Sequence, residues 1–309
     1  MFEKLLLMID KCLVSSLHCQ VQSKRHRRNH LKLVVFLLAQ KVCTADWDYK
    51  GEKLNGPKDW SKTHPFCTGL LQSPINIHPI QISPPSSDNI IWFDNYYMHP
   101  AAGESYTLSN NGRTLMFEFP RDTPYYLKKG QNTFVPLQAH IHFGSQFHKG
   151  SEHGLNGNYF QAEIHIVHRN MKYNSTKLLH YSDGLLVIGV FAKLSAFARS
   201  SPVIAELAYY TEVLTRPGSS VKIPAFPMMA FFPCDSLKCT PYVNYQGSLT
   251  TPPCAESVDW VVLTKQAHPI NLRDLQAMDK VLDCGRLPLY GNYRPTQATN
   301  GRQLYGVNM

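Results

Sequence analysis

The chain has 309 residues, of which 43% are hydrophobic and 17% are charged, and its formal net charge is +9. This composition excludes a disordered chain, and the length suits one large domain or two small ones. Because no change in composition divides the middle of the chain, we expect one domain at residues 46–300 and a C-terminal tail at 301–309. The basic residues are mostly scattered and no nucleic-acid-binding motif appears, so the charge does not predict a nucleic-acid partner.

Residues 1–45 are expected to be a leader. A basic cluster at 24–28 precedes a short apolar run at 31–39, and the small residue Ala45 follows. These features are typical of a signal peptide, and the apolar run is too short for a membrane span, which needs about 20 residues. The first 29 residues exceed what a signal peptide needs, so they are either an extension or follow a start site placed too early. We therefore expect a secreted, extracellular protein without a membrane anchor.

The cysteines and one sequon agree with an oxidising, extracellular compartment. Five of the eight cysteines lie beyond the leader, at Cys67, Cys234, Cys239, Cys254 and Cys284. Some of them should pair, and because five is an odd number, at least one thiol is free or forms an intermolecular bond. Asn174-Ser175-Thr176 matches the N-glycosylation sequon and suits a surface loop, so Asn174 is a candidate glycosylation site.

The predicted regular structure consists mainly of β-strands. Residues 46–88 are rich in glycine, proline and aromatic residues, and they are expected to form an irregular arm packed by aromatic rings. Short alternating runs separated by turn signals across residues 89–127 predict a β-meander. The runs at 184–192 and 257–263 are apolar on both faces, which is typical of buried central strands.

Two helices are expected at the periphery. Residues 200–216 begin with serine and proline and repeat apolar residues on one face, and Pro217-Gly218 stops this pattern. A second, short helix is expected to start at Asn271. The predicted fold class is therefore α+β and strand-dominated, as a single domain with a few short peripheral helices.

Two short runs place three histidines where they can converge. His140 and His142 are two residues apart, and His165 lies on a second alternating run. Side chains two residues apart on a strand point to the same face, so neighbouring strands would bring the three imidazoles together. Three neutral nitrogen donors with a vacant fourth position suit a catalytic zinc ion. Gln138 and Glu163 each lie two residues from a candidate ligand and can accept a hydrogen bond from its ring.

The other histidines are predicted to be packing residues, because a lone histidine in a mixed sheet is seldom a ligand. They are His64, His78, His99, His148, His153, His168, His180 and His268.

The loop at 245–254 carries Thr250 and Thr251 and is stiffened by two prolines. It can be read as a rigid turn that leads into the strand at 257–263, or as a support for hydroxyl groups that orient a water molecule at a metal. The isolated carboxylate of Glu152 is a suitable acceptor for a threonine hydroxyl. A threonine oxygen held in this way must accept a hydrogen bond from the water instead of donating one.

Taken together, these residues resemble the α-class carbonic anhydrases over most of the chain, from about Trp47 to Pro295. The motifs that carry the resemblance are Gln72-Ser73-Pro74, Asn110-Asn111-Gly112, Gln138-Ala139-His140-Ile141-His142, Ser151-Glu152-His153, Glu163-Ile164-His165, Ser248-Leu249-Thr250-Thr251-Pro252-Pro253 and Tyr293-Arg294-Pro295. The resemblance implies a single domain around a large twisted, mostly antiparallel β-sheet, with Zn²⁺ at the base of a cone-shaped cleft. It also implies an enzyme, a zinc-dependent carbonate dehydratase, in which zinc-bound hydroxide hydrates carbon dioxide reversibly to bicarbonate and a proton.

The same resemblance implies a role for each matching residue. His140, His142 and His165 match the zinc ligands, which Gln138 and Glu163 hold in place. Thr250 matches the threonine that orients the hydroxide, and Glu152 matches its partner. The residues implied to contact the substrate are Val167, Val187, Leu249, Thr251 and Trp260. Tyr49, Asn111 and Thr251 match the polar wall that orders water, and Cys67 and Cys254 match the disulfide of extracellular members.

The sequence departs from the family pattern at a few positions. Arg113 stands where the family usually carries its proton-shuttle histidine. Because arginine stays charged, it cannot relay a proton near neutral pH, so we expect turnover limited by proton export and increased by imidazole buffers. Phe143 and Arg169 stand where tryptophan is usual, and Met116 replaces a commonly polar residue.

An alternative from another class is a secreted zinc-bearing matrix or binding protein with little turnover. Non-catalytic relatives typically lack one or more ligand histidines, whereas all three are present here. A metal-dependent protease would carry an H-E-x-x-H motif, which the sequence lacks. The expected partners are carbon dioxide and bicarbonate, and the oligomeric state is not predicted.

Overall fold

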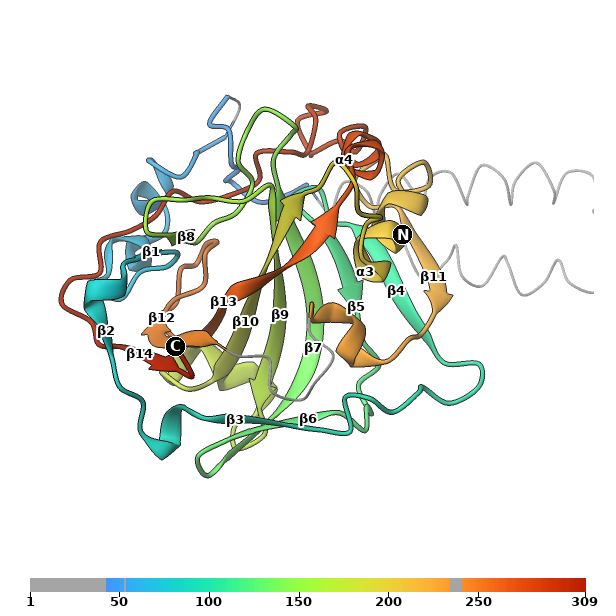
Figure 1. The fold of residues 1–309 in the computed structure, drawn as a ribbon. Coiled ribbons are helices and arrows are strands. Elements are labelled where there is room, and N and C mark those ends of the chain that lie inside the picture. Colours follow the sequence, from blue (N-terminus) through green and yellow to red (C-terminus); the bar gives the residue numbers. More distant parts are fainter. Residues whose placement is uncertain (1–42, 53, 234–240) are drawn as a thin grey trace, which may run out of the picture. The chain divides into compact units, whose positions relative to one another are not determined.

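The computed structural model describes residues 43–52, 54–233 and 241–309 (Figure 1). The predicted basic cluster at 24–28 and apolar run at 31–39 lie outside the described residues. Ala45–Met309 form one compact unit, which contains the whole of the main β-sheet. Among the described residues, no helix is both long and apolar enough to cross a membrane.

A large mixed sheet of 12 strands dominates this unit, which confirms the predicted fold class. Ten strands follow one another across the sheet: β11 (Ser220–Pro224), β4 (Ser105–Asn110), β5 (Leu115–Glu118), β7 (Asn132–Phe143), β9 (Ala162–Asn170), β10 (Leu185–Leu194), β13 (Val258–Ile270), β12 (Tyr242–Gly247), β14 (Leu304–Val307) and β2 (Ile82–Ser83). Within this sheet, among the residues that the structure describes, only the pairs β10–β13 and β14–β2 are parallel. Figure 1 shows the strong twist from one strand to the next. The tail predicted at 301–309 contributes β14 to the sheet.

The β-meander predicted at 89–127 is wrong, because consecutive strands do not all pair with each other. Four strands do form there, but β3 (Ile91–Asp94) pairs with β6 (Tyr126–Lys129), while β4 pairs with β5. The reason is the length of β7, whose 12 residues offer one edge to two partners. Its first residues pair with β6, and its last ones pair with β5.

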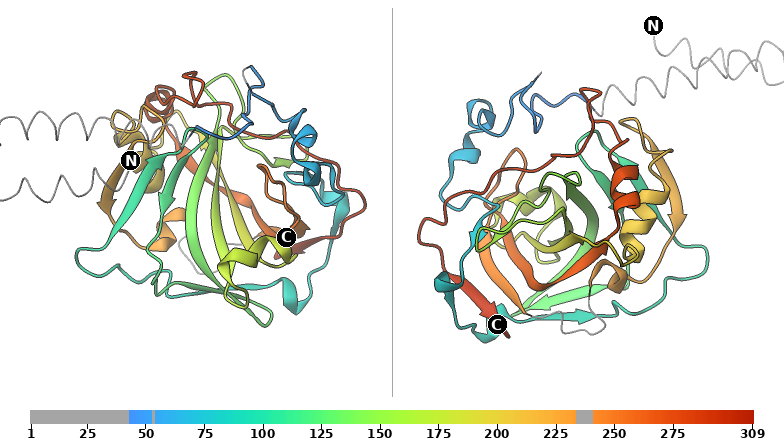
Figure 2. Two further views of the ribbon diagram at one scale, coloured as in Figure 1. Left: turned by 180° about the vertical axis from the view of Figure 1, so that it is seen from behind. Right: turned by 45° about the horizontal axis from the view of Figure 1, so that its top comes forward.

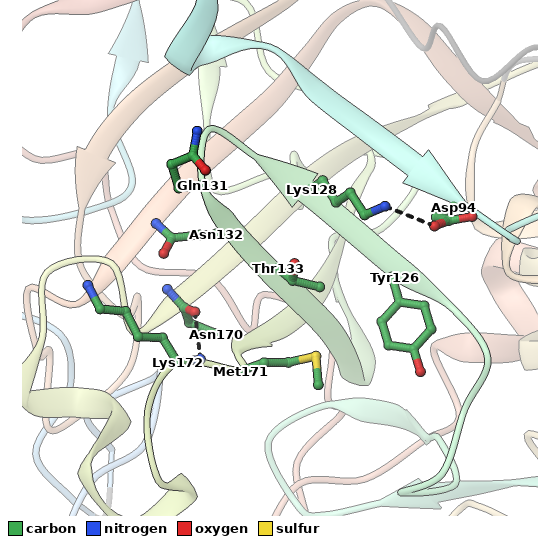
Figure 3. Close-up of a pocket in the computed structure, with 9 residues that line it drawn as sticks. All are labelled: Asp94, Tyr126, Lys128, Gln131, Asn132, Thr133, Asn170, Met171 and Lys172. Carbon is green, nitrogen blue, oxygen red and sulfur yellow. Dashed lines mark hydrogen bonds and ion pairs between the residues drawn. The ribbon is translucent and has the colours of Figure 1, made fainter.

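The outer face of β3 and β6 borders a hollow of about 560 Å³ near the start of β7 (Figure 3). The residues that line it are mostly of polar types, and the ammonium group of Lys128 lies 3.2 Å from Asp94 Oδ2. Thr133 in this hollow is seven residues from His140 on the same strand, or roughly 23 Å at the usual rise per residue. The hollow is therefore well separated from the histidines.

The two predicted helices are present, but the first is shorter than expected. Helix α3 covers Pro202–Tyr209 and ends in turns instead of continuing to residue 216. The hydroxyl of Thr211 donates to the carbonyl of Ala208 at 2.8 Å, and such side-chain bonds compete with the helical pattern. Helix α4 covers Leu272–Met278 and so begins one residue after the predicted start at Asn271, which is its N-cap and accepts a hydrogen bond from the amide of Asp274.

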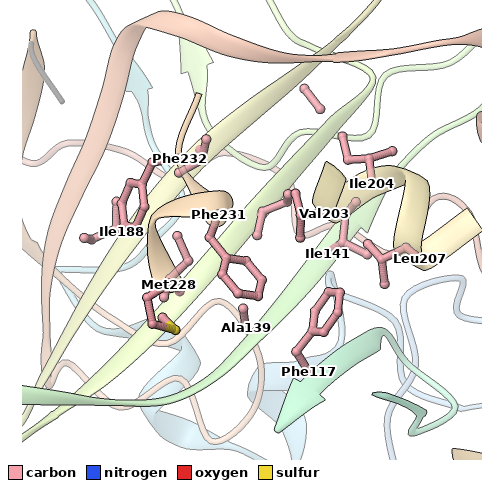
Figure 4. Close-up of a cluster of buried hydrophobic side chains, with 14 of the residues drawn as sticks. Phe117, Ala139, Ile141, Ile188, Val203, Ile204, Leu207, Met228, Phe231 and Phe232 are labelled. Atoms are coloured by element: carbon pink, nitrogen blue, oxygen red, sulfur yellow. The ribbon is translucent and has the colours of Figure 1, made fainter. Parts of the chain in front are cut away.

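The alternation along β7 separates the hydrophobic core from the polar face. Ala139 and Ile141 are buried in the main core, against side chains from α3 and from the short helix η6 (Met228–Phe231), as Figure 4 shows. His140 and His142 therefore lie on the opposite face. The predicted central strands are confirmed, because β10 and the first half of β13 are buried on both faces.

The N-terminal arm and the segment near the C-terminus run along the same end of the sheet (Figure 2). The remaining short elements are mostly in this arm: η1 (Trp60–Lys62), η2 (Pro65–Thr68), β1 (Asn76–Ile77), η3 (Pro79–Gln81), η4 (Ser87–Asn89), β8 (Gly154–Leu155) and η5 (Ser175–His180). Trp47, Tyr49 and Trp60 contact each other edge to face, with ring centroids 5.2–5.8 Å apart. The predicted packing of this arm by aromatic rings is confirmed.

Candidate metal centre

Strands β7 and β9 are antiparallel neighbours and bring three histidines together. His140 lies directly opposite His165, and His142 lies opposite Glu163. The ring centroids of the three histidines are 4.6–5.2 Å apart, and one nitrogen of each lies within 4.8 Å of the others. The predicted convergence of the three imidazoles is confirmed.

Each of these imidazoles has one nitrogen fixed by the protein. Nδ1 of His140 donates to Gln138 Oε1 at 2.9 Å, and Nδ1 of His142 donates to the carbonyl of Asn292 at 2.6 Å. Nε2 of His165 donates to Glu163 Oε1 at 2.8 Å. The remaining nitrogens are Nε2, Nε2 and Nδ1, respectively, and these atoms are available to a shared partner.

Two further observations test whether this cluster fits a metal ion. Nε2 of His142 is buried and has no hydrogen-bond partner in the described part of the chain, which is costly unless a missing partner accepts its lone pair. Burial lowers the pKa of His140 well below its ordinary value, that of His142 to about 3, and also that of His165. Neutral rings are the form that binds metal, so the three residues fit zinc.

Glu163 is held by a dense set of hydrogen bonds. Its Oε1 accepts from His165 and from Nδ1 of His153 at 2.6 Å, and its Oε2 accepts from the amides of Glu152 and His153. Burial would raise the pKa of Glu163, but the two histidines outweigh it and hold this pKa well below the ordinary value. The carboxylate therefore stays ionised and fixes the orientation of His165.

His153 is a packing residue, as predicted, but no feature of the sequence indicated that it also positions the site. Its side chain is fully buried, and Nε2 accepts from the hydroxyl of Tyr245 at 2.7 Å while Nδ1 donates to Glu163. Both nitrogens are used within the protein. This is the difference between His153 and the three converging histidines.

Glu152 lies beside the point of convergence. Its Oε2 is 3.5 Å from Nε2 of His142 and 3.9 Å from Nδ1 of His165, and its Oε1 accepts from the backbone amide of Arg294 at 2.7 Å. Burial raises the pKa of Glu152 well above the ordinary value, while the Arg294 amide and the Thr250 hydroxyl act in the opposite direction. This influence agrees with the expected contact between Thr250 and Glu152, which stays a prediction.

The predicted apolar residues form one wall next to the histidines. Val187 on β10 lies between Val167 on β9 and Trp260 on β13, in direct register with both. Leu249 packs against the same cluster, and the Trp260 ring lies 4.8 Å from that of His165. This wall can exclude water from one side of the centre.

The three residues predicted for the polar wall, Tyr49, Asn111 and Thr251, each make a different kind of contact. The ring of Tyr49 lies edge-on to His142, with centroids 6.3 Å apart. The side-chain oxygen of Asn111 accepts from the amides of Arg113 and Thr114, so it stabilises the turn. The carbonyl of Thr251 accepts from the amide of Cys254 at 2.8 Å, within the loop that carries Thr250.

Arg113 is held against the N-terminal arm. Its guanidinium lies 4.6 Å from the ring centroid of Trp47, and its Nη2 donates to the carbonyl of Trp47 at 3.3 Å. Burial lowers the pKa of Arg113, while Tyr49 and nearby carboxylates act in the opposite direction. The backbone carbonyl of Arg113 accepts from Asn292, whose own carbonyl binds His142.

The predicted disulfide between Cys67 and Cys254 is present and packs with Trp47 and Trp60. Cys284 is also disulfide-bonded, and so is Cys43, although the predicted leader at 1–45 contains it. A cleavage after Ala45 would remove a bonded cysteine, so this finding does not agree with the expected leader boundary. Cys234 and Cys239 lie outside the described residues. Asn174 is exposed at the start of η5, and its side-chain oxygen accepts from the amide and the hydroxyl of Thr176.

The fold and the centre together define a class of protein: a single-domain β-sheet protein with a buried three-histidine site of the kind that binds catalytic zinc. Residues 55–308 match the family model of the eukaryotic-type carbonic anhydrases, so the chain belongs to this family of carbon dioxide-hydrating zinc enzymes.

Individual relatives agree with the family match. Human carbonic anhydrase 12 is 30% identical over 268 residues, covering 84% of this chain and 72% of the relative. Carbonic anhydrase 3 of Mus musculus is 31% identical over 265 residues, covering 83% and 96%. Carbonic anhydrase 6 of Canis lupus familiaris is 30% identical over 265 residues, covering 83% and 78%.

Proposed function

We propose that this chain catalyses the reversible hydration of carbon dioxide with zinc held by His140, His142 and His165. The observation that carries the proposal is the donor set: three imidazoles, half-buried at His140 and buried at His142 and His165, each with one nitrogen fixed and the other available to a common point. In carbonic anhydrases, zinc acts as a Lewis acid that makes hydroxide available near neutral pH.

The residues around the histidines have separate roles in the proposed reaction. With Glu152 as its acceptor, the hydroxyl of Thr250 has only its oxygen lone pairs left for the attacking hydroxide, which it thereby orients. Val167, Val187, Leu249 and Trp260 offer carbon dioxide an apolar surface, while Thr251, Tyr49 and Asn111 offer hydrogen-bonding groups to water. Gln138 and Glu163 hold the ligand rings.

Proton export is the slow step in this proposal. Arg113 occupies the shuttle position, and its guanidinium is both charged and anchored on Trp47. A group that stays protonated cannot carry a proton away, so a buffer must do it. Added imidazole should therefore increase turnover at saturating carbon dioxide.

Stopped-flow hydration of carbon dioxide tests the activity. The full chain is produced in a secretory host, assayed with and without imidazole, then stripped of metal with a chelator and reconstituted with zinc. We expect the rate to disappear on stripping and to return with zinc. Bound zinc without a hydration rate above background would refute the enzyme and favour the binding-protein alternative.

We further propose that the protein is secreted as one domain after removal of a leader, and that residues 301–309 belong to this domain, because they supply β14 of its sheet. The Cys67–Cys254 disulfide and the exposed sequon at Asn174 support an oxidising, glycosylating compartment. The medium of secreting cells should contain the protein, and a glycosidase should reduce its mass. The variant Asn174→Gln should show no such reduction. Retention inside the cell would contradict this proposal.

A further inference from the structure

Lys149 lies in the loop between β7 and β8 and contacts two tyrosine rings. Its ammonium nitrogen is 3.3 Å from the ring centroid of Tyr159 and 5.1 Å from that of Tyr293. An ammonium group within about 6 Å of an aromatic ring is attracted to its face. The side chain is half-buried, so its aliphatic stem also packs in the protein.

The two rings belong to different parts of the chain. Tyr159 is on the same hairpin as Lys149, where the amides of Gly150 and Ser151 both donate to the carbonyl of Phe160. Tyr293 is on the segment at residues 292–296, which is called the C-terminal segment here and which contacts this loop at Lys149. The hydroxyl of Tyr159 lies 3.3 Å from the hydroxyl oxygen of Thr296, a second link between the hairpin and that segment.

Both neighbours of Tyr293 touch the candidate centre through their backbones. The carbonyl of Asn292 accepts from Nδ1 of His142 at 2.6 Å, and the amide of Arg294 donates to Glu152 Oε1 at 2.7 Å. Glu152 itself follows Lys149 by three residues in the same loop. Lys149 therefore joins the loop that carries Glu152 to the segment that holds Glu152 and His142.

We infer that Lys149 is a positioning residue for Glu152 and, through Glu152, for Thr250. The cation holds the loop and the C-terminal segment at the separation that allows the Arg294 amide to bind Glu152. This inference rests on the proposed function of Thr250 and Glu152 in orienting the attacking hydroxide. Orientation of the hydroxide affects its reaction with carbon dioxide, which kcat/KM reports, and does not affect proton export, which limits kcat. A change at Lys149 should therefore lower kcat/KM more than kcat.

The test compares Lys149→Met, which keeps the length of the stem and removes the charge, with Lys149→Arg, which keeps the cation. We expect Lys149→Met to lower kcat/KM for carbon dioxide hydration about tenfold, which is less than the roughly hundredfold loss that a 1 Å misplacement can cause. At low buffer concentration, where proton export limits turnover, kcat should stay close to the wild-type value. Lys149→Arg should recover most of kcat/KM.

A matched control is Lys172→Met. The ammonium group of Lys172 lies 5.3 Å from the ring centroid of Tyr173, which is the same kind of contact on an exposed turn. Its loss should leave both constants unchanged. Zinc content and the melting temperature of each variant should be measured in parallel.

The possible results distinguish a positioning role of Lys149 from a structural role, and failure of this inference from failure of the proposed function. If Lys149→Met lowers kcat and kcat/KM in equal proportion, the variant has lost active enzyme and the role is merely structural. Wild-type kcat/KM in a folded Lys149→Met variant would also overturn the inference, while leaving the proposed function intact. A wild-type protein that does not hydrate carbon dioxide would overturn both.

Discussion

The histidine cluster (His140, His142 and His165) and the aromatic arm (Trp47, Tyr49 and Trp60) meet at His142 but are held in different ways. One nitrogen of every ring in the cluster donates a hydrogen bond to an oxygen of Gln138, Glu163 or Asn292, which fixes the ring. The arm is held by edge-to-face ring contacts and a disulfide.

This difference agrees with the expected departure from the family pattern at Arg113. Directional hydrogen bonds leave each ring of the cluster one orientation, and a metal site requires such precision. Ring contacts tolerate a range of neighbours, and the arm accommodates the guanidinium of Arg113 on the face of Trp47. The cluster is therefore predicted to be intolerant of change, and the arm tolerant.

The largest effect is expected from His142→Ala. Removal of one of three donors, together with an unfilled space in a buried site, should eliminate bound zinc and reduce hydration to the uncatalysed rate. The matching change in the arm, Trp47→Leu, should retain zinc and most of the activity. Metal analysis and stopped-flow assays measure both. Equal loss of zinc in the two variants would break the comparison.

A smaller effect is expected from Glu163→Gln. The amide keeps the shape of the side chain but offers one acceptor oxygen to the four N–H groups that Glu163 now satisfies. Zinc affinity should fall by roughly 10–100-fold, which is typical when a group that orients a ligand is lost. Competition with a chelator measures this affinity. The control Gln138→Ala removes one neutral partner, and its effect should be smaller.

The expected effect of Arg113→His is a gain of several-fold. A histidine can accept and release a proton near neutral pH, so kcat at low buffer concentration should rise and its dependence on imidazole should weaken. The value of kcat/KM should not change. The control Arg113→Gln removes the charge without adding a shuttle, and a similar increase in that variant would show that the charge alone limits turnover.

His268 belongs to neither region and serves as a reference for the effect of one buried histidine on the pH dependence of stability. It lies on β13, and its Nε2 donates to the carbonyl of Phe231. Burial lowers its pKa to about 4, so the unfolded chain binds a proton that the native state does not. Its contribution to stability is complete above pH 6.5 and is lost as the pH falls towards 4.

As the pH falls from 6.5 to 4, the His268 side chain alone should lower the free energy of unfolding by up to about 3 kcal/mol. Urea unfolding between pH 4 and pH 7 measures it. His268→Gln keeps the N–H donor and does not titrate, so its stability should depend less on pH in this range. Identical pH dependence in the two proteins would show that His268 does not titrate as expected.

Alternation along a strand is the part of the site that could be predicted from the sequence. His140 and His142 had to share a face, and Ile141 had to point into the core, because side chains alternate in any strand. The lone histidines His153 and His268 were also predicted correctly as packing residues. What distinguishes them from the converging histidines is whether both ring nitrogens are used, and only spatial neighbours determine that.

The zinc-compatible residues and the strand-dominated fold follow from residue types and their spacing, so the amino-acid sequence was enough to predict them. The backbone groups that hold these residues emerge only when the chain is folded. The carbonyl of Asn292 and the amide of Arg294 act on His142 and Glu152 from 150 and 142 residues away. Every residue but proline carries the same carbonyl and amide, so these partners leave no trace in the sequence. The same holds for the pairing of β3 with β6 and for the contacts of Lys149, which exist only because distant segments meet.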